Sequence, residues 1–429
     1  MTTGQIADRY DVLVVGSGSA GSSAAICAAR AGAHTLLLDR LGFLGGTSTA
    51  VLDTFYAFYT PGEHPRRVVG GLGWEVVERL TAEGVAFERP NTYGAGTGVT
   101  YDQETLKFVW ERLAQDAGVD ILLHSWATGV DVRDNKVDAV RIWNKGGERW
   151  ISAAVVVDAS GDADVSAMSG VGYEDFRSTG VVQSLSTLFR LANVDVAVAA
   201  QTKKADMWAL MREAAATGAY ELPRLEGSWH RTPFAGVVMV HMTRIPNVDA
   251  TDPVALTAAE IEGRRQVREY QRFLRDRVPG FEKSVVVGTS PSIGVRESRR
   301  VIGDYQLTQE DVLTARRFDD EVALCGAPIE DHRPGGGTEW QYVPGGAVYG
   351  IPYRALLPRN VDGLLVAGRC FSSTHDAHAS ARSMATCMAM GQAAGTAASM
   401  AALGNRLPRD VSPHELRNML IERGAILDL

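Results

Sequence analysis

The sequence has 429 residues, of which 45% are hydrophobic and 22% are charged, as in ordinary globular proteins. This length predicts two or three domains, each with a core large enough to fold without disulfides. The net charge of −8 argues against nucleic acids and anionic membrane surfaces as partners, because both attract clustered Lys and Arg. No uninterrupted apolar run reaches membrane-spanning length, so we expect no membrane insertion.

The four cysteines are widely spaced and form neither a CxxC pair nor a metal-ligand pattern, so no metal is expected. Their small number fits a reducing compartment, and the first residues lack the apolar core of a secretion signal. The expected location is therefore the cytoplasm. The sequence leaves a homo-oligomer open.

The first predicted elements form a β-α-β unit. Residues 10–15 are a continuous apolar strand, as expected where both faces of a parallel sheet are covered. The hexapeptide GSGSAG at 16–21 follows, then an Ala-rich helix to Arg30 and a second apolar strand at 35–38 that ends at Asp39. A strand, a GxGxxG loop, a helix and an acid about 20 residues onward are the dinucleotide-binding fingerprint.

Each part of this motif has a physical role. Gly16 permits a tight turn, Gly18 lets the backbone approach a pyrophosphate, and Gly21 allows close packing of helix on strand. The amide groups and dipole at the start of the helix, where Ser19 lies, attract phosphate groups. Asp39 is placed to accept hydrogen bonds from ribose hydroxyls.

The following segments continue the α/β pattern. Residues 102–117 have the periodicity of an amphipathic helix, and residues 121–123 predict a short strand. Two alternating runs at 129–133 and 137–143 precede a third strand at 150–157. Together these three strands predict an antiparallel meander beside the parallel sheet.

The pattern changes to α+β between residues 176 and 342. Strand-like runs at 184–191 and 236–242 flank a helical segment at 207–217, and a charged helix is predicted at 258–277. We interpret residues 176–342 as an inserted substrate domain.

Sheet-type sequence resumes at 362–368 and is followed by one long helix of small residues, about 379–403. Within it, Gly391 and Gly395 form a GxxxG pair, which predicts close helix packing in a soluble core. The predicted fold is therefore α/β, with a Rossmann-type nucleotide domain at 1–175 and 343–429 and the inserted domain at 176–342.

The loop after Asp39 bears on which dinucleotide is bound. Residues 40–49 (RLGFLGGTST) form a glycine-rich turn, whereas NAD dehydrogenases usually continue with helix at this point. Four further motifs follow: VDASGD at 157–162, IGVRESRR at 293–300, YGIPYRALLP at 349–358 and GRCFSSTHDAH at 368–378. With these motifs the sequence resembles the FAD-dependent oxidoreductase family of glutathione-reductase-type flavoproteins, in the branch that carries the GVRESRR and GRCFSSTHDAH motifs.

The resemblance implies FAD as the cofactor. The residues it assigns to FAD are Gly16, Gly18, Ser19, Gly21, Asp39, Arg40, Gly45, Gly46, Thr47, Val130, Gly161, Asp162, Gly368 and Asp376. Residues 40–49 contain neither His nor Cys, so the FAD is expected to be non-covalent. The helix after residue 379 is expected to point its N-terminus at the flavin and stabilise negative charge on its reduced form.

Catalysis requires a base near the flavin edge, because the substrate carbon gives up hydride while its O–H or N–H loses a proton. His375 and His378 lie in the motif expected beside that edge, and a neutral imidazole is the natural base near pH 7. His375 is equally compatible with a supporting or FAD-contacting role. His241, in the strand at 236–242, is a further candidate from the inserted domain.

The arginines of the GVRESRR motif are the remaining candidates. Arg296 or Arg299 could bind a substrate carboxylate through paired hydrogen bonds, or donate a proton to an alkene. The alternative is an internal salt-bridge network with Glu297 and Asp304.

The leading hypothesis for function is an FAD-dependent dehydrogenase or oxidase. It would take hydride from a C–H next to O or N of a small organic substrate and pass electrons to oxygen or another acceptor. One alternative is a flavin-dependent reductase of an activated C=C bond, and another is a protein in which FAD is structural.

Overall fold

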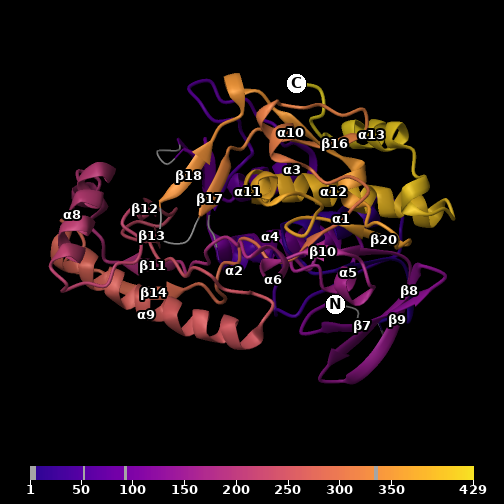
Figure 1. Cartoon of the computed structure of the whole chain (residues 1–429), viewed down its shortest axis with the longest axis horizontal. Helices are drawn as coiled ribbons and strands as arrows, with labels where there is room; N and C mark the ends of the chain where they lie inside the picture. The colour runs from indigo at the N-terminus through magenta and orange to yellow at the C-terminus, as the bar shows by residue number, and fades with distance from the viewer. Residues whose placement is uncertain (1–5, 52–53, 91–93, 333–336) are drawn as a thin grey trace.

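The computed structural model describes residues 6–51, 54–90, 94–332 and 337–429 (Figure 1). Its largest sheet is centred on β1 (Arg9–Val15), which pairs in parallel with β2 (Thr35–Leu38) and β9 (Gly147–Asp158). Beyond these, β6 (Asp120–Leu122) pairs with β2, and β20 (Leu364–Val366) pairs with the end of β9, again in parallel. The Rossmann-type α/β fold predicted from the sequence is confirmed.

The meander is also confirmed. β7 (Trp126–Arg133), β8 (Lys136–Asn144) and β9 pair antiparallel in chain order. The first half of β9 pairs with β8 and its second half with β20, so one long strand joins the meander to the parallel sheet.

Two helices of small residues pack against each other over this sheet. α1 (Ser19–Arg30) and α12 (Met384–Leu403) approach so closely that a Cβ at Gly391 would lie 2.1 Å from Ala20 O. A Cβ at Gly395 would lie 2.0 Å from Ala24 O. The close helix packing predicted from the GxxxG pair is confirmed, and it lies in the hydrophobic core of this domain.

The single helix predicted at 379–403 is wrong, because two helices occupy this region. α11 (His375–Ala381) begins earlier, where the Thr374 side chain accepts a hydrogen bond from Ala377 N. Ser383 then adopts an extended conformation (ψ 147°) as the N-cap of α12. Serine favours caps over helix interiors, so the break follows from a local preference that the Ala-rich composition concealed.

A second lobe lies at the left of Figure 1. Its antiparallel sheet has the order β12 (Ser228–Arg231), β13 (Val238–His241), β11 (Phe189–Ala192), β14 (Val285–Thr289). The helices α8 (Lys204–Ala216) and α9 (Pro253–Arg277) pack with it around a separate hydrophobic cluster. The strand predicted at 184–191 begins only at Phe189, because residues 185 and 186 make single bridges to Ile245 and Gly294 instead of a ladder.

The division at residues 175 and 342 stays a prediction. β16 (Glu321–Cys325), inside the predicted insertion, pairs with β19 (Tyr349–Pro352) outside it. Both strands belong to the core that also contains α1 and α12.

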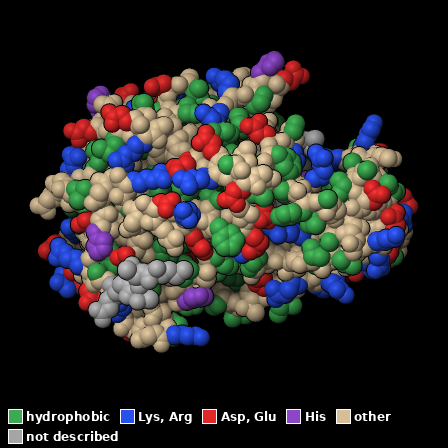
Figure 2. Space-filling model, turned by 180° about the vertical axis from the view of Figure 1, so that it is seen from behind, with side chains coloured by type: hydrophobic (Ala, Val, Ile, Leu, Met, Phe, Trp, Pro, Cys, Tyr) green, Lys and Arg blue, Asp and Glu red, His purple; other side chains and the backbone are tan. Residues whose placement is uncertain are grey.

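The remaining elements are α2 (Thr47–Ala50), β3 (Thr54–Phe55), α3 (Gly71–Ala82), β4 (Ala86–Arg89), β5 (Gly98–Tyr101), α4 (Gln103–Asp116), α5 (Asp164–Met168), β10 (Tyr173–Glu174), α6 (Phe176–Thr179), α7 (Val196–Ala199), β15 (Arg300–Val301), α10 (Gln309–Leu313), β17 (Ile329–His332), β18 (Thr338–Gln341), α13 (Pro413–Glu422) and the 3-10 helices η1 (Pro344–Gly346), η2 (Tyr353–Leu356) and η3 (Pro408–Asp410). Among the described helices, none combines the length and apolar character that crossing a bilayer requires. Acidic and basic side chains are mixed over the face shown in Figure 2.

Candidate active site

The loop between β1 and α1 keeps an open space beside Gly18. A Cβ at Gly18 would meet no atom within 4 Å, whereas one at Gly16 would lie 2.5 Å from Ala159 O and one at Gly21 1.7 Å from Gly16 O. Gly16 and Gly21 are therefore required by the fold itself. At position 18, neither the neighbouring atoms nor the backbone angles (φ −61°) require glycine, so the space beside Gly18 is available to a ligand.

Unsatisfied polar groups surround this space. The first amide groups of a helix have no intrahelical acceptor, and Gly18, the N-cap of α1, has no side chain that could accept from them. The hydroxyl of Ser19 is buried and has no hydrogen-bond partner among the described residues. A phosphate would satisfy both and would be stabilised by the helix dipole, so the site fits the FAD pyrophosphate.

Asp39 joins the glycine loop to the next segment. Its carboxylate is buried and accepts hydrogen bonds from Ser17 N (2.6 Å), Ser17 Oγ (2.7 Å) and Leu41 N (2.8 Å). A carboxylate has about four acceptor positions, so Asp39 retains capacity for a ribose hydroxyl. It has a structural role that the motif alone did not reveal.

The loop after Asp39 lies directly against the glycine loop. Gly45 N donates to Ser17 O (2.7 Å), and a Cβ at Gly46 would lie 2.7 Å from Gly18 Cα. Gly45 and Gly46 both have positive φ (103° and 52°), which explains why glycine occupies both positions. Arg40 and Thr47, at either end of this loop, are exposed.

Residues from the other half of the domain close the same region. Gly368 (φ 83°) places its Cα so that a Cβ would lie 2.8 Å from Ala20 Cβ, in the first turn of α1. Asp162 binds Arg369 (2.8 Å) and accepts a hydrogen bond from Ser298 Oγ (2.7 Å). Burial opposes ionisation of Asp162, but the charge of Arg369 together with hydrogen bonds from Ser298 and Arg369 outweighs burial and lowers the pKa of Asp162.

The structure also gives the positions of three other residues that the resemblance assigns to FAD. A Cβ at Gly161 would lie 2.8 Å from Arg369 Nη2. Val130 lies on β7 of the meander, and Asp376 is a half-buried residue in the first turn of α11.

His375, at the start of α11, is held between two carboxylates. Its Nδ1 lies 2.8 Å from Glu297 Oε2 and its Nε2 lies 3.3 Å from Asp331 Oδ1. Burial lowers the pKa of His375, but hydrogen bonds and charges of Asp331 and Glu297 outweigh burial and raise it to about 9. The imidazole is therefore protonated at pH 7, unlike the neutral base expected from the sequence.

Asp331, His375 and Asp376 bring possible metal-ligand atoms within 4.8 Å of one another. Both ring nitrogens of His375 already contact carboxylates, however, so we interpret these three residues as part of an ion-paired cluster.

The other predicted catalytic residues divide into two groups. His378 is fully buried, and its Nε2 donates a hydrogen bond to Arg369 O (2.8 Å). Arg299 donates to Asp162 O (2.9 Å) and forms an ion pair with Asp164 (3.0 Å). Both therefore brace the segments around the cofactor loop. Arg296, in contrast, donates to His241 Nε2 (2.9 Å), so these two predicted residues come together.

Burial and nearby arginines hold the pKa of His241 well below 6.5, so its imidazole is neutral. Because Nε2 accepts from Arg296, the proton of this ring is on Nδ1.

Sequence reasoning missed three residues of this region: Glu297 as the partner of His375, Asp331, and Arg382 between α11 and α12. The sequence suggests Glu297 only as a partner of the motif arginines. It predicts Arg382 to lie inside one continuous helix. The Arg382-Ser383 pair within an Ala-rich run is the local signal that could have identified the break.

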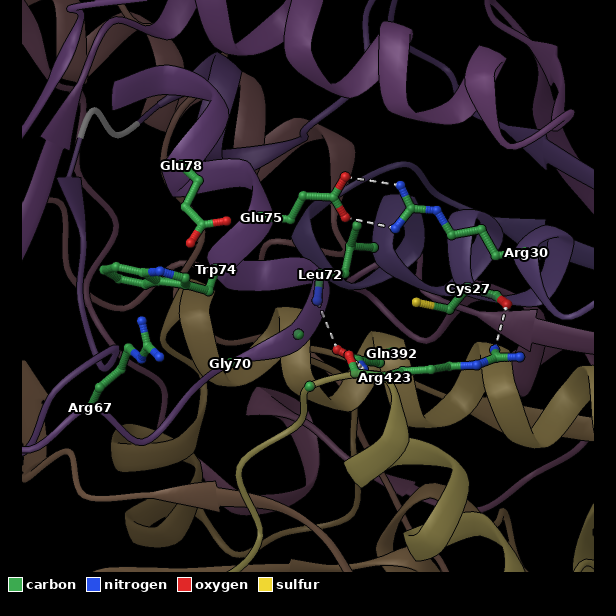
Figure 3. A pocket seen from close by; sticks show the side chains of 12 residues that line it. Cys27, Arg30, Arg67, Gly70, Leu72, Trp74, Glu75, Glu78, Gln392 and Arg423 are labelled. Carbon is green, nitrogen blue, oxygen red and sulfur yellow. Dashed lines mark hydrogen bonds and ion pairs between the residues drawn. The ribbon is translucent and has the colours of Figure 1, made fainter. Parts of the chain in front are cut away.

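A separate pocket of about 610 Å³ lies at the opposite end of α1 (Figure 3). It is lined by Cys27, Arg30, Arg67, Gly70, Gly71, Leu72, Trp74, Glu75, Glu78, Gln392, Arg423 and Gly424. Arg30 and Glu75 pair through two contacts (2.7 and 3.0 Å), and Arg67 lies 4.4 Å over the Trp74 ring. None of these residues belongs to the predicted cofactor or catalytic sets.

The strand–loop–helix unit, the open phosphate position and the buried acid after β2 define a dinucleotide-binding flavoprotein fold. Comparison with known families agrees, since the family model described as FAD dependent oxidoreductase matches residues 11–420. The chain belongs to this family, and FAD is its cofactor. The closer resemblance to the glutathione-reductase-type branch stays a prediction.

Curated relatives match only part of the chain. The digeranylgeranylglycerophospholipid reductase of Methanosarcina mazei is 25% identical over 173 residues, which are 38% of this chain and 41% of the relative. The reductase of the same name from Thermoplasma volcanium is 27% identical over 202 residues, 44% of this chain and 48% of the relative. The matched region thus spans less than half the length of either reductase.

Solved structures resemble the chain over nearly its whole length. BexE, described in connection with oxidation during BE-7585A biosynthesis, has a TM-score of 0.50 at 15% identity and covers 97% of this chain and 66% of its own. The geranylgeranyl bacteriochlorophyll reductase-like protein of Thermoplasma acidophilum has a TM-score of 0.49 at 15% identity, with 97% and 84% covered. The match to BexE supports the shared fold.

Proposed function

We propose that this chain is an FAD-dependent dehydrogenase or oxidase that removes hydride from a carbon next to O or N of a small organic substrate. Bound FAD supplies the hydride acceptor, and oxygen or another acceptor removes the electrons. One observation carries the proposal: the chain has both an open space at Gly18 that fits a phosphate and an imidazole, His375 at the start of α11, that can exchange a proton.

His375 is suited to exchange a proton with substrate. Its contact with Glu297 is short and fixes Nδ1, whereas the contact of Nε2 with Asp331 is longer (2.8 against 3.3 Å). Nε2 is therefore the atom that can replace Asp331 by a substrate hydroxyl or amine. About 16% of the His375 side chain is exposed, so the ring is accessible from one side.

The raised pKa of His375 makes the direction of the reaction testable. To accept a proton from substrate the ring must first lose its own, so flavin reduction by substrate should accelerate as pH rises toward about 9. A second candidate function, reduction of an activated C=C bond, is favoured by the protonated state at pH 7. In that case the rate should fall above about pH 9, because the donor is lost.

The test is anaerobic stopped-flow bleaching of the holoenzyme with sugars, hydroxy acids and amines, across pH 6 to 10. His375→Gln should slow bleaching at least tenfold and remove the pH dependence while FAD stays bound. His378→Gln is the matched control within the same helix, and its pH profile should keep the shape of the wild type. Bleaching by none of these compounds, with reduced flavin that no acceptor reoxidises, would instead favour a structural FAD.

A further inference from the structure

Two guanidinium groups in the molecule's interior are bonded only to neutral acceptors. Arg296 donates to Ser184 O (2.7 Å), Ser186 Oγ (2.9 Å) and His241 Nε2. Arg382 donates through Nη2 to Gln183 Oε1 and Glu330 O, both at 3.2 Å. Within the described part of the chain, neither arginine forms an ion pair with a carboxylate.

Both guanidiniums are anchored to one segment, residues 183–186, and are therefore neighbours. Hydrogen-bonding capacity is left over beside them: the Nε of Arg382 and the Nε2 of Gln183 are buried without a partner in the described structure. Gln183 itself is fully buried. A donor set of this kind, unpaired and shielded from water, costs free energy until an acceptor binds.

Two of the three acids near Arg382 are engaged elsewhere, because Glu297 pairs with Arg300 and His375, and Asp331 contacts His375. The third, Glu330, lies 3.1 Å from His332 Nε2, but burial holds the pKa of His332 well below 6.5, so Glu330 keeps its charge and offsets only one of the two guanidiniums. Burial, reinforced by the like charge of Arg382, lowers the pKa of Arg296. Guanidinium nevertheless keeps its proton in proteins, so the surplus positive charge persists and favours an anion.

This pair of arginines adjoins the expected flavin end of the cofactor loop. Arg382 immediately precedes Ser383, the N-cap of α12, the helix expected to face the flavin. A Cβ at Gly294, two residues before Arg296, would lie 2.8 Å from Val51 Cγ1, at the end of α2. Gln183 N also donates to Glu297 Oε2 (3.1 Å), which links the segment to His375.

We infer that Arg296 and Arg382 bind a carboxylate of the substrate, so the substrate class is a small organic acid. Planar guanidinium forks match the two oxygens of a carboxylate, and Gln183 Nε2 supplies a further donor. The carboxylate would neutralise the surplus charge and fix the reacting carbon between the flavin and His375. This inference rests on the proposed function for its substrate but not for the anion site itself.

The test titrates the holoenzyme with acetate, benzoate and succinate, and with acetamide, benzamide and succinamide as uncharged counterparts. Binding is read from the flavin absorption spectrum and, independently of flavin, from the thermal unfolding temperature. At constant ionic strength, the acids should bind and the amides should not. Sodium sulfate and phosphate, titrated in the same way, distinguish a carboxylate site from a general anion site.

Arg296→Gln and Arg382→Gln should each weaken acid binding roughly tenfold to a hundredfold, because a charge-assisted contact is lost. Arg382→Lys should recover part of the affinity, since lysine restores the positive charge but not the two parallel hydrogen bonds of the planar guanidinium. Arg264→Gln, an exposed arginine of α9 paired with Glu260, is the matched control and should bind like the wild type.

Equal binding of acids and amides, tighter binding of sulfate or phosphate than of any acid, or unchanged acid affinity in both glutamine variants would overturn the inference. Failure of the proposed function gives a different result. Flavin would then stay oxidised with every substrate, while the acids would still raise the unfolding temperature of the wild type but not that of a variant carrying both Arg296→Gln and Arg382→Gln.

Discussion

The cofactor loop and the arginine–histidine region are built in opposite ways. Around Gly18 the important groups are backbone amides, set by one continuous stretch of chain from β1 to α1. Around Arg296 the important groups are side chains from segments far apart in the sequence, namely residues 183–186, 241, 296 and 382. The first fits the pyrophosphate, a group common to all dinucleotides, and the second can be altered without changing the fold that carries it.

This difference predicts which physical effect determines the outcome of a substitution in each region. At Gly16 and Gly21 of the cofactor loop, and at Gly391 of the α1–α12 contact, steric clash decides the outcome because neighbouring backbone leaves no room for a side chain. At Gly18 the protein leaves room, so a side chain there would compete with the ligand alone.

Around Arg296, His241 and Arg382, charge decides the outcome of a substitution, because these side chains are hydrogen-bonded in buried surroundings with little water. Substitutions in the two regions should therefore differ in both the size and the kind of their effects.

Gly391→Val should prevent folding. Its Cβ would lie 2.1 Å from Ala20 O, and the obstacle is backbone of α1 that cannot rotate away. Soluble expression and circular dichroism measure the effect. Gly288→Val is the matched control, because a Cβ there meets nothing within 4 Å, and it should fold normally. A folded, cooperative Gly391→Val protein would show that the α1–α12 contact is not as tight as described.

Gly18→Val should fold but lose FAD completely. The side chain has room in the protein and would occupy the space where the pyrophosphate lies. Absorption of the purified protein near the flavin bands, with an unfolding temperature close to that of apo wild type, measures both halves of the prediction. A variant that purifies yellow would remove Gly18 from the phosphate site.

FAD should leave the wild-type protein when it is denatured. The loop at 40–49 contains neither His nor Cys, although His124 packs against Gly42 of that loop. Precipitation with acid should leave all the flavin in the supernatant. Yellow protein in the pellet would indicate a covalent bond, with His124→Ala as the first variant to examine.

His375→Gln should lower stability in a pH-dependent way. The pKa of His375 rises from 6.5 to about 9 on folding, so its stabilisation is complete below about pH 6.5 and is lost as pH rises to about 9. The difference in unfolding free energy between wild type and variant, from urea titrations, should shrink by roughly 3 kcal/mol over this range.

His378→Gln provides the control for that prediction. Burial lowers the pKa of His378 well below 6.5, so its titration falls at lower pH. The difference between wild type and this variant should stay constant between pH 6.5 and 9. A constant difference for His375→Gln as well would mean that the carboxylates do not hold the imidazolium.

Arg299→Gln should have the smallest effect, a loss of about 1 kcal/mol in unfolding free energy. Its guanidinium pairs with Asp164 and lies 5.4 Å over the Tyr173 ring, with partial exposure to solvent. Thermal denaturation measures the change. A loss of several kcal/mol would show that Arg299 is as tightly integrated as the buried arginines.

Local patterns were sufficient for the cofactor half of the molecule. Alternation predicted the meander, small residues predicted close packing of the C-terminal helix, and glycine spacing predicted the strand–loop–helix unit. Each of these features depends on residues close in sequence or on a periodicity that the sequence displays directly. The break at Ser383 was missed because composition outweighed a single capping residue.

Local residue order specifies the strand–loop–helix unit and the acid at its end, because backbone geometry follows from neighbouring residues, and the further motifs indicated FAD through the family resemblance. Only the tertiary structure decided that His375 lies between Glu297 and Asp331, and that Arg296 and Arg382 share one segment without an acid. Protonation and charge balance depend on which side chains meet, and those meetings join residues separated by up to about 200 positions.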